Sequence, residues 1–96
     1  MKIVFDPRKS ERNRRQRGLP FDDTADFDWE TAIYREDTRK PYPESRFLAL
    51  GFLDERLHAL CFTPTAEGIR IISFRKANAR EVRRYHEEKE IKAADE

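Results

Sequence analysis

The segment at residues 69–77 combines three cations with apolar side chains, which makes it the part of the chain best suited to binding an anion. It reads Ile-Arg-Ile-Ile-Ser-Phe-Arg-Lys-Ala, and its cations are Arg70, Arg75 and Lys76. Alternation along a strand would place Arg70, Ile72 and Phe74 on one face, and Ile69, Ile71, Ser73 and Arg75 on the other. An arginine in so apolar a strand needs a partner for its charge. We therefore expect Arg70 to contact either a carboxylate or an anionic ligand.

Two further groups of residues have the chemistry to bind phosphate. Arg75 and Lys76 lead directly into the last predicted helix, whose first backbone amides lack partners within the helix and favour phosphate. In the first predicted helix, Lys9, Asn13 and Arg17 are spaced four residues apart and therefore share one face. The alternative is that these cations only form a solvated surface.

Metal, nucleophile and cofactor motifs are not indicated by the sequence. The candidate ligands His58, His86 and Cys61 lack the spacing of a metal site. His58 and Cys61 are three residues apart in a predicted strand, so they should point to opposite faces, and Cys61 is expected in the core. The glycines at positions 18, 51 and 68 are too scattered to build a phosphate-binding or dinucleotide-binding loop. We therefore expect no cofactor and no metal.

Positive charge is gathered in two blocks of the chain, although the net charge of the whole is only +1. Residues 1–20 hold seven basic and two acidic side chains, and residues 69–86 hold six basic and one acidic. Between them, residues 21–37 hold one basic and seven acidic side chains. Blocks of Lys and Arg favour polyanions, because each neutralised phosphate releases condensed counterions. The pattern therefore favours a nucleic-acid partner over an uncharged one.

The length and composition are those of one small domain. The chain has 96 residues, of which 38% are hydrophobic and 41% are charged, so one thin core is expected to hold the whole chain. The lone Cys61 allows no internal disulfide. We find no apolar run with the length of a membrane span or a signal peptide, so we expect a cytoplasmic protein without membrane contact.

The N-terminal half is predicted to hold two strands and two helices. Residues 2–5 favour a strand, and Asp6 and Pro7 favour a helix N-terminus that leads into a helix ending before Gly18. That helix has no apolar residue from Arg8 to Arg17, so its ends, its long side chains or a partner must hold it. A second short helix is predicted at residues 21–28, and a strand is predicted at residues 29–35.

The C-terminal half is predicted to form three strands and a helix. Runs at residues 46–53, 57–63 and 69–75 are joined by short turns, which favours an antiparallel meander. Asn78 and Glu81 have the spacing of a capping box at the start of a last helix, which should fray after about Ile91. The fold class is therefore α+β, a mostly antiparallel sheet with two N-terminal helices and one C-terminal helix.

The chain as a whole resembles the BrnT toxins. The residues that carry the resemblance are Ile3 to Pro7, Lys9, Asn13, Arg17, Gly18, Phe21, Arg46, Phe47, Gly51, Arg70 to Ala77, Glu81 and Tyr85. The segment Arg70 to Ala77 is the most specific of these. The sequence departs from the family at Gln16-Arg17-Gly18, where BrnT toxins commonly have Lys-His-Gly. An imidazole exchanges a proton near neutral pH and a guanidinium does not, so Arg17 could only bind or stabilise an anion.

The resemblance implies a fold and a partner. It implies that residues 1–96 form a single small RelE-like domain, a ribonuclease toxin of a bacterial type II toxin–antitoxin system. The partner would be a BrnA-like antitoxin with a ribbon-helix-helix, through which alone the complex would contact DNA.

The resemblance also implies a reaction. The toxin would cleave RNA without metal, by attack of the ribose 2′-hydroxyl on the adjacent phosphorus, and so inhibit translation. Arg70 and Arg75 would stabilise the transition state, and Tyr85 would act as acid or base with His58 in reserve. The RNA backbone would be held by Lys9, Asn13, Arg17, Arg46 and Lys76.

Two other functions are compatible with the same residues. The chain could be an inactive relative whose basic surfaces bind an antitoxin segment or RNA without cleavage, and the exchange of histidine for Arg17 favours this alternative. It could also be a structural subunit whose charged blocks pair within an assembly, in which case RNA binding would depend weakly on salt.

Overall fold

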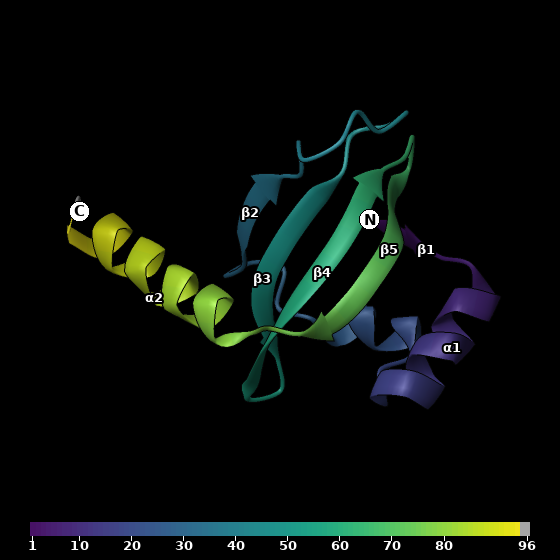
Figure 1. Ribbon diagram of the computed structural model, residues 1–96, viewed down its shortest axis with the longest axis horizontal. Coiled ribbons are helices and arrows are strands. Elements are labelled where there is room, and N and C mark those ends of the chain that lie inside the picture. Colours follow the sequence, from purple (N-terminus) through teal and green to yellow (C-terminus); the bar gives the residue numbers. More distant parts are fainter. Residues whose placement is uncertain (95–96) are drawn as a thin grey trace.

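The computed structural model describes residues 1–94, in which five strands form one sheet with helical segments on both of its faces (Figure 1). In chain order the elements are β1 (Lys2–Val4), α1 (Pro7–Arg17), the 3-10 helix η1 (Phe21–Asp26), β2 (Ile33–Glu36), β3 (Phe47–Leu53), β4 (Arg56–Pro64), β5 (Gly68–Lys76) and α2 (Ala79–Ala94). The strand order is β1-β5-β4-β3-β2. Only β1 and β5 are parallel within this sheet, so the predicted α+β class with a mostly antiparallel sheet is confirmed.

The three long strands form the predicted meander. Leu53 pairs with Arg56, so β3 and β4 are joined by a two-residue turn. Asp54 in that turn has a φ of 55°, in the left-handed region that Asp tolerates better than most residues. β2 then extends the sheet at the far edge of β3, and β1 at the far edge of β5.

A bulge in β5 changes which of its residues share a face. Cys61 pairs with Ser73 and Phe62 pairs with Ile71, so Ile72 has no partner on β4. The inserted residue shifts the alternation by one position from Ser73 onward. Ile71 and Phe74 therefore lie in the same core cluster, although simple alternation puts them on opposite faces.

The same shift corrects the sequence-based placement of the two arginines of β5. Thr63 pairs with Arg70 and Cys61 pairs with Ser73, and Thr63 and Cys61 are two residues apart on one strand. Arg70, Ser73 and Arg75 consequently share one face of the sheet. Alternation without a bulge had put Arg70 and Arg75 on different faces.

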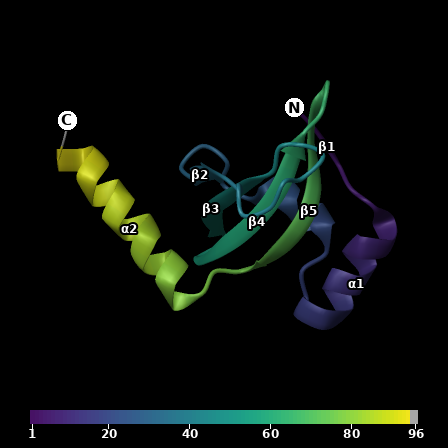
Figure 2. The ribbon, with the colours of Figure 1, turned by 45° about the horizontal axis from the view of Figure 1, so that its top comes forward.

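Each face of the sheet carries its own core cluster, and α1 and α2 lie on opposite sides of the sheet (Figure 2). On the face covered by α1 and η1, the buried residues include Phe21, Phe27, Leu60, Ile71 and Phe74. On the face towards α2, the buried cluster consists of Leu50, Leu57, Ala59, Ala77 and Tyr85. The α2 helix packs on this second face through Val82 and Tyr85 near its start and then extends away from the sheet.

Polar bonds hold α1, as its lack of apolar residues requires. Asp6 accepts a hydrogen bond from the Arg8 amide at 2.8 Å, and Gly18, with a φ of 69°, closes the C-terminus, so both predicted ends are confirmed. Ser10 is buried, and its Oγ accepts a hydrogen bond from the Phe21 amide at 2.8 Å. This bond ties α1 to η1.

Three boundaries differ from the sequence prediction. The segment predicted as a second N-terminal helix is the six-residue 3-10 helix η1, so α1 is the one α-helix in the first 50 residues. The strand predicted at residues 29–35 begins later, at Ile33, because Asp28 accepts hydrogen bonds from the amide and hydroxyl of Thr31 and forms a turn there. The α2 helix continues beyond Ile91 to Ala94, and residues 95 and 96 lie outside the described part of the chain. A search of the described helices finds none whose length and apolar character suit a membrane span.

Candidate nucleic-acid interface

A cavity of about 690 Å³ lies on the face of the sheet towards α2. We call it the arginine cavity, because six arginines line it: Arg35, Arg39, Arg46, Arg75, Arg80 and Arg84. Its acidic lining residues are Glu36, Asp37 and Glu81, so the six cations face three anions. A hollow with this excess of guanidinium groups favours an anionic ligand.

The floor of the arginine cavity is one row of paired residues across four strands. Arg35 pairs with Leu48, Leu48 with Cys61, and Cys61 with Ser73. Directly paired residues point to the same face of a sheet, so all four side chains face the cavity. Burial raises the pKa of the Cys61 thiol, which keeps it in its neutral, unreactive form.

Arg75 is held in position by Glu81 at the start of α2. Its Nη1 and Nη2 donate hydrogen bonds to the two carboxylate oxygens of Glu81 at 2.7 and 3.0 Å. This contact holds the pKa of Glu81 below its usual range, because the ionised carboxylate is the form that accepts both bonds. The guanidinium of Arg75 therefore has a fixed orientation at the rim of the sheet.

Glu81 also completes the predicted capping box of α2. Its Oε1 accepts a hydrogen bond from the Asn78 amide, and Asn78 Oδ1 accepts one from the Glu81 amide, both at 2.9 Å. The capping box is thus confirmed. It also means that two of the amides proposed as a phosphate site are already bonded within the protein.

Arg46 is held by an aromatic ring and lacks a carboxylate partner within residues 1–94. Its Cζ lies 4.1 Å from the centroid of the Tyr42 ring. Its Nε is buried and has no hydrogen-bond partner in the described chain. Arg39 differs, because Asp37 accepts hydrogen bonds from its Nε and Nη2 at 2.9 and 2.8 Å. The positive charge of Arg46 is therefore less neutralised than that of Arg39 or Arg75.

A second hollow of about 320 Å³ lies between α1 and β5, and we call it the α1–β5 groove. Its cations are Lys9, Arg12, Arg17 and Arg75, and none of its lining residues among those described is acidic. Ile72, Ser73 and Arg75 line both the groove and the arginine cavity. The two hollows therefore adjoin at the bulge of β5, and Arg75 stands at their shared border.

Asn13 lines the groove, but its side-chain amide already makes two bonds. Nδ2 donates to the carbonyl oxygens of Leu19 at 2.6 Å and of Phe74 at 2.8 Å. The second bond fastens α1 to the open edge of β5, beyond the short β1 strand. The structure thus gives Asn13 a role in the fold, where the sequence predicted contact with RNA.

Of the nine predicted site residues, the structure brings five to these adjoining hollows and places four elsewhere. The five are Lys9, Asn13, Arg17, Arg46 and Arg75. Arg70 lines neither hollow, and its Nη2 donates a hydrogen bond to Glu44 at 2.6 Å. The alternative of a carboxylate partner for Arg70 is thereby confirmed. Lys76 is exposed and pairs with His58 at the end of β5, so it also lines neither hollow.

The two predicted acid–base residues are buried away from the hollows. Tyr85 is 6% exposed, lies in the core cluster towards α2, and its hydroxyl donates a hydrogen bond to the Thr31 carbonyl at 3.2 Å. His58 is 3% exposed and packs on the Phe74 ring, on the opposite face from Arg75. Burial lowers the pKa of His58, so its imidazole is neutral at physiological pH. Neither side chain lines the groove or the arginine cavity.

Several residues of the interface were not predicted from the sequence. They are Arg12 in the groove, and Arg35, Arg39, Tyr42, Arg80 and Arg84 in the arginine cavity. A signal existed for Arg80 and Arg84, which are four residues apart and so share a helix face. Arg39 and Tyr42 belong to the segment between β2 and β3, where no periodic pattern indicates a direction.

Histidine is not among the described residues that line either hollow, so neither offers a group that titrates near neutral pH. In the same part of the chain, no cluster of three or more His, Cys, Asp or Glu side chains is arranged to hold a metal ion. What the two hollows can do is bind an extended anion and stabilise additional negative charge on it.

Comparison with known proteins supplies the family. A family model described as the ribonuclease toxin BrnT of type II toxin-antitoxin systems matches residues 5–81, well over half of the chain. The match covers β5 and the capping box, and it ends before most of α2. The comparison with curated proteins gave no match. The resemblance noted in the sequence is confirmed, and the chain belongs to the BrnT family of ribonuclease toxins of type II toxin–antitoxin systems.

Proposed function

We propose that this toxin cleaves RNA at the border between the α1–β5 groove and the arginine cavity. The observation that carries the proposal is that Arg75 lines both hollows, whose lining residues are otherwise rich in cations. A single RNA strand passing over the bulge of β5 would place one phosphate in the groove and the next near Arg75. Lys9, Arg12 and Arg17 would hold the first of these phosphates.

The proposed reaction needs no cofactor. The ribose 2′-hydroxyl loses its proton to hydroxide from the solvent and attacks the adjacent phosphorus, the bond to the 5′-oxygen breaks, and that oxygen takes a proton from water, which restores the hydroxide. The products are a 2′,3′-cyclic phosphate and a free 5′-hydroxyl. The pentacoordinate transition state carries extra negative charge, which the fixed guanidinium of Arg75 and the carboxylate-free guanidinium of Arg46 would stabilise.

This assignment revises the roles given to four residues on the sequence alone. Arg70 is paired with Glu44 and would act by positioning the segment that carries Glu44. Lys76 would contribute only to the general positive field, since it lies outside both hollows. Tyr85 and His58 receive no part in the proposed reaction, because both are buried and line neither hollow.

The family also implies an antitoxin partner. We propose that this partner is a BrnA-like ribbon-helix-helix protein, that any contact with DNA is made through it, and that the complex works in the cytoplasm. We further infer that residues 1–96 form a single RelE-like domain. Detection of a small open reading frame for a ribbon-helix-helix protein beside the toxin gene would support the partnership.

The test of the proposed reaction compares three arginine variants on a mixed-sequence RNA in the presence of a metal chelator. Removing one donor from such a site costs roughly 10²–10³ in rate, so Arg46→Ala and Arg75→Ala should each lose about that much. Arg56→Ala is the matched control, because Arg56 is exposed and lines neither hollow. Equal cleavage by all three variants, or fragments without cyclic phosphate ends, would contradict the proposal.

One observation favours a second function. The lining residues of both hollows within residues 1–94 include no histidine, and Arg17 stands where BrnT toxins commonly have one. A relative that has lost proton transfer would still bind RNA or an acidic antitoxin segment through its arginines. Expression that fails to arrest growth, together with RNA binding and no cleavage by the purified protein, would establish this function. Growth arrest on expression that is relieved by co-expression of the antitoxin would instead establish toxin activity.

A further inference from the structure

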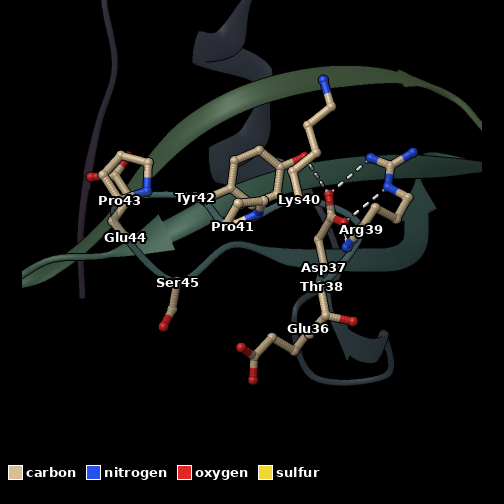
Figure 3. Close-up of a pocket in the computed structure, with 10 residues that line it drawn as sticks. All are labelled: Glu36, Asp37, Thr38, Arg39, Lys40, Pro41, Tyr42, Pro43, Glu44 and Ser45. Atoms are coloured by element: carbon tan, nitrogen blue, oxygen red, sulfur yellow. Dashed lines mark hydrogen bonds and ion pairs between the residues drawn. The ribbon is translucent and has the colours of Figure 1, made fainter.

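A third hollow, of about 540 Å³, is formed by the segment between β2 and β3. Its lining is the continuous stretch Glu36–Ser45, which we call the loop pocket (Figure 3). Its acidic residues, Glu36, Asp37 and Glu44, outnumber its cations, Arg39 and Lys40. The loop pocket therefore differs in charge from the two cationic hollows and does not favour a phosphate.

Tyr42 forms a wall between the loop pocket and the arginine cavity. It lines both hollows, as do the four residues Glu36, Asp37, Thr38 and Arg39. The guanidinium of Arg46 lies against the Tyr42 ring from the direction of the arginine cavity. In Figure 3 the Tyr42 ring lies beside Pro41 and the Asp37 carboxylate, and Glu36 and Ser45 lie lower in the view with their side chains directed away from the ring. A flat group entering the loop pocket would thus meet an aromatic surface within a few ångströms of the arginines.

The loop pocket is held in shape by bonds along its length. Asp37 accepts hydrogen bonds from the Arg39 amide and guanidinium and from the Tyr42 hydroxyl, the last at 3.3 Å. These contacts hold the pKa of Asp37 well below its usual range, with the Arg39 bonds as the main cause. At the other end, Ser45 is fixed through its carbonyl, which accepts a bond from the Thr63 hydroxyl at 2.6 Å. A pocket fixed in advance loses little entropy when a ligand binds.

We propose that the loop pocket binds the nucleobase of an RNA nucleotide whose phosphate lies in the arginine cavity, with Tyr42 as the stacking residue. This inference rests on the proposed function, since it needs RNA in the arginine cavity. Sequence-selective proteins recognise single-stranded RNA by splaying bases out onto aromatic rings and binding their edges. A neutral base suits the loop pocket, whereas its acidic lining disfavours the phosphate itself.

The lining of the loop pocket further indicates which bases fit. Its side-chain oxygens without an ion-pair partner in the described chain include those of Glu36, Thr38 and Ser45, whereas Glu44 is already paired with Arg70. The carboxylate of Glu36 is exposed and forms no ion pair within residues 1–94. Adenine, guanine and cytosine each present an exocyclic amino group with two N–H donors to such acceptors, whereas uracil presents only its single N3–H. We therefore expect an amino-bearing base to bind more tightly than uracil.

The first test removes bases from the ligand one at a time. The probe is a mixed-sequence hexanucleotide with 2′-O-methyl riboses, which lacks the attacking hydroxyl and so stays intact, and six versions of it each carry one abasic position. For the wild-type protein we expect one position at which loss of the base weakens binding by roughly 5-fold to 100-fold, the range for stacking on an aromatic side chain. Equal affinity for all six abasic versions would overturn the inference.

Two substitutions test whether the loss of affinity at that abasic position depends on Tyr42. Tyr42→Ala should bring the ratio of intact to abasic affinity close to one, and Tyr42→Phe, which keeps the ring, should retain most of it. The ratio is the readout because Tyr42→Ala also removes the ring that supports Arg46 and will weaken all seven ligands together. An unchanged ratio in Tyr42→Ala would overturn the inference even if absolute affinity falls.

A third comparison tests the base preference. At the sensitive position, a ligand with cytosine should bind about tenfold more tightly than one with uracil, the size expected for one hydrogen bond to a charged acceptor. Glu36→Gln should reduce this ratio, and Glu44→Gln is the matched control because Glu44 is already paired with Arg70. Tighter or equal binding of the uracil ligand would overturn the preference.

The outcomes also separate this inference from the proposed function. RNA binding that depends on Arg46 and Arg75 but shows no sensitive base position would overturn the proposal that the loop pocket binds a base. It would not contradict the proposed nuclease site. A sensitive position together with no cleavage of the matching ribo-oligonucleotide would support the loop pocket and favour the non-catalytic function. Absence of any RNA binding would overturn both.

Discussion

The two faces of the sheet are built in contrasting ways. The face towards α1 and η1 buries large aromatic and aliphatic residues, and polar bonds from Ser10 and Asn13 close it. On the face towards α2, only Glu81 and Tyr85 of that helix are buried, and arginines occupy much of the remaining surface. The first face supplies most of the apolar burial that stabilises the fold. The second face can therefore carry a dense group of like charges, whose mutual repulsion the core must offset.

The largest expected effect tests whether the first face carries the stability. Phe74 is 1% exposed and contacts the rings of Phe27 and His58, so Phe74→Ala should cost about 3–5 kcal/mol of the free energy of unfolding. Phe52→Ala is the matched control on the other face, where the ring is only half-buried and should cost roughly 1–3 kcal/mol. Urea denaturation of both variants measures the difference. Equal losses would contradict the contrast between the faces.

The second effect tests the polar closure of the first face. Asn13→Ala removes the two bonds to the Leu19 and Phe74 carbonyls and should cost about 1–3 kcal/mol of unfolding free energy, because both acceptors lose their partner. Gln16→Ala is the control, since Gln16 is exposed on the same helix. If Asn13 serves only RNA, both variants will have the stability of the wild type, as measured by urea denaturation.

The third prediction concerns the ion pair between Glu81 and Arg75 on the face towards α2, and how its contribution to stability depends on pH. Glu81→Gln keeps the cap of α2 but removes the charge that pairs with Arg75, and it should cost about 1 kcal/mol at pH 7 after allowance for partial exposure of the arginine. The folded-state pKa of Glu81 lies below its ordinary value of 4.5, so its contribution to stability is present above pH 4.5 and is lost as the pH falls through the folded pKa.

Urea denaturation across pH 3–7 tests whether this contribution to stability is lost as the pH falls. The difference in stability between the wild type and Glu81→Gln should shrink as the pH falls from about 4.5 through the folded pKa of Glu81, because both proteins carry an uncharged group at residue 81 once that carboxyl is protonated. A gap that stays constant down to pH 3 would show that the Arg75 contact contributes nothing through charge.

The smallest expected effect concerns Arg17 in the α1–β5 groove. Arg17→Ala should weaken RNA binding and reduce the slope of log affinity against log salt by about 0.7, the value for one phosphate contact on a single strand. Arg56→Ala, which alters an exposed arginine outside both hollows, should leave the slope unchanged. Fluorescence anisotropy of a labelled RNA over a range of salt concentrations measures both slopes. Identical slopes for the two variants would remove Arg17 from the interface.

The sequence predicted the elements whose signals are local. Asp6, Pro7 and Gly18 mark the ends of α1, and Asn78 with Glu81 marks the start of α2, because caps depend on residues a few positions apart. The meander was likewise predictable, since its three strands are apolar and joined by short turns. Family membership was predictable because the segment from Arg70 to Ala77 is so specific.

The features without a local signal in the sequence depend on pairing and packing across the fold. Nothing about Ile72 as a residue type marks it as the unpaired residue of a bulge, because its exclusion is decided by the register between β4 and β5. The resemblance implies an acid–base role for Tyr85, but no local signal indicates that its position on α2 places it over Phe52 in a core cluster. The loop pocket had no periodic signal at all, because bonds from Asp37 and Thr63 determine its shape.

The single unpaired residue of β5 makes the length of that strand as important as its composition. Deleting Ile72 would remove the bulge and keep every other pair, so Arg75 would stay on its present face. Inserting one residue between Ser73 and Phe74 without a further bulge would instead turn Phe74 away from the aromatic core and Arg75 towards it, although no arginine had been replaced. For this toxin, a one-residue insertion at that point should therefore be more damaging to function than most single exchanges in β5.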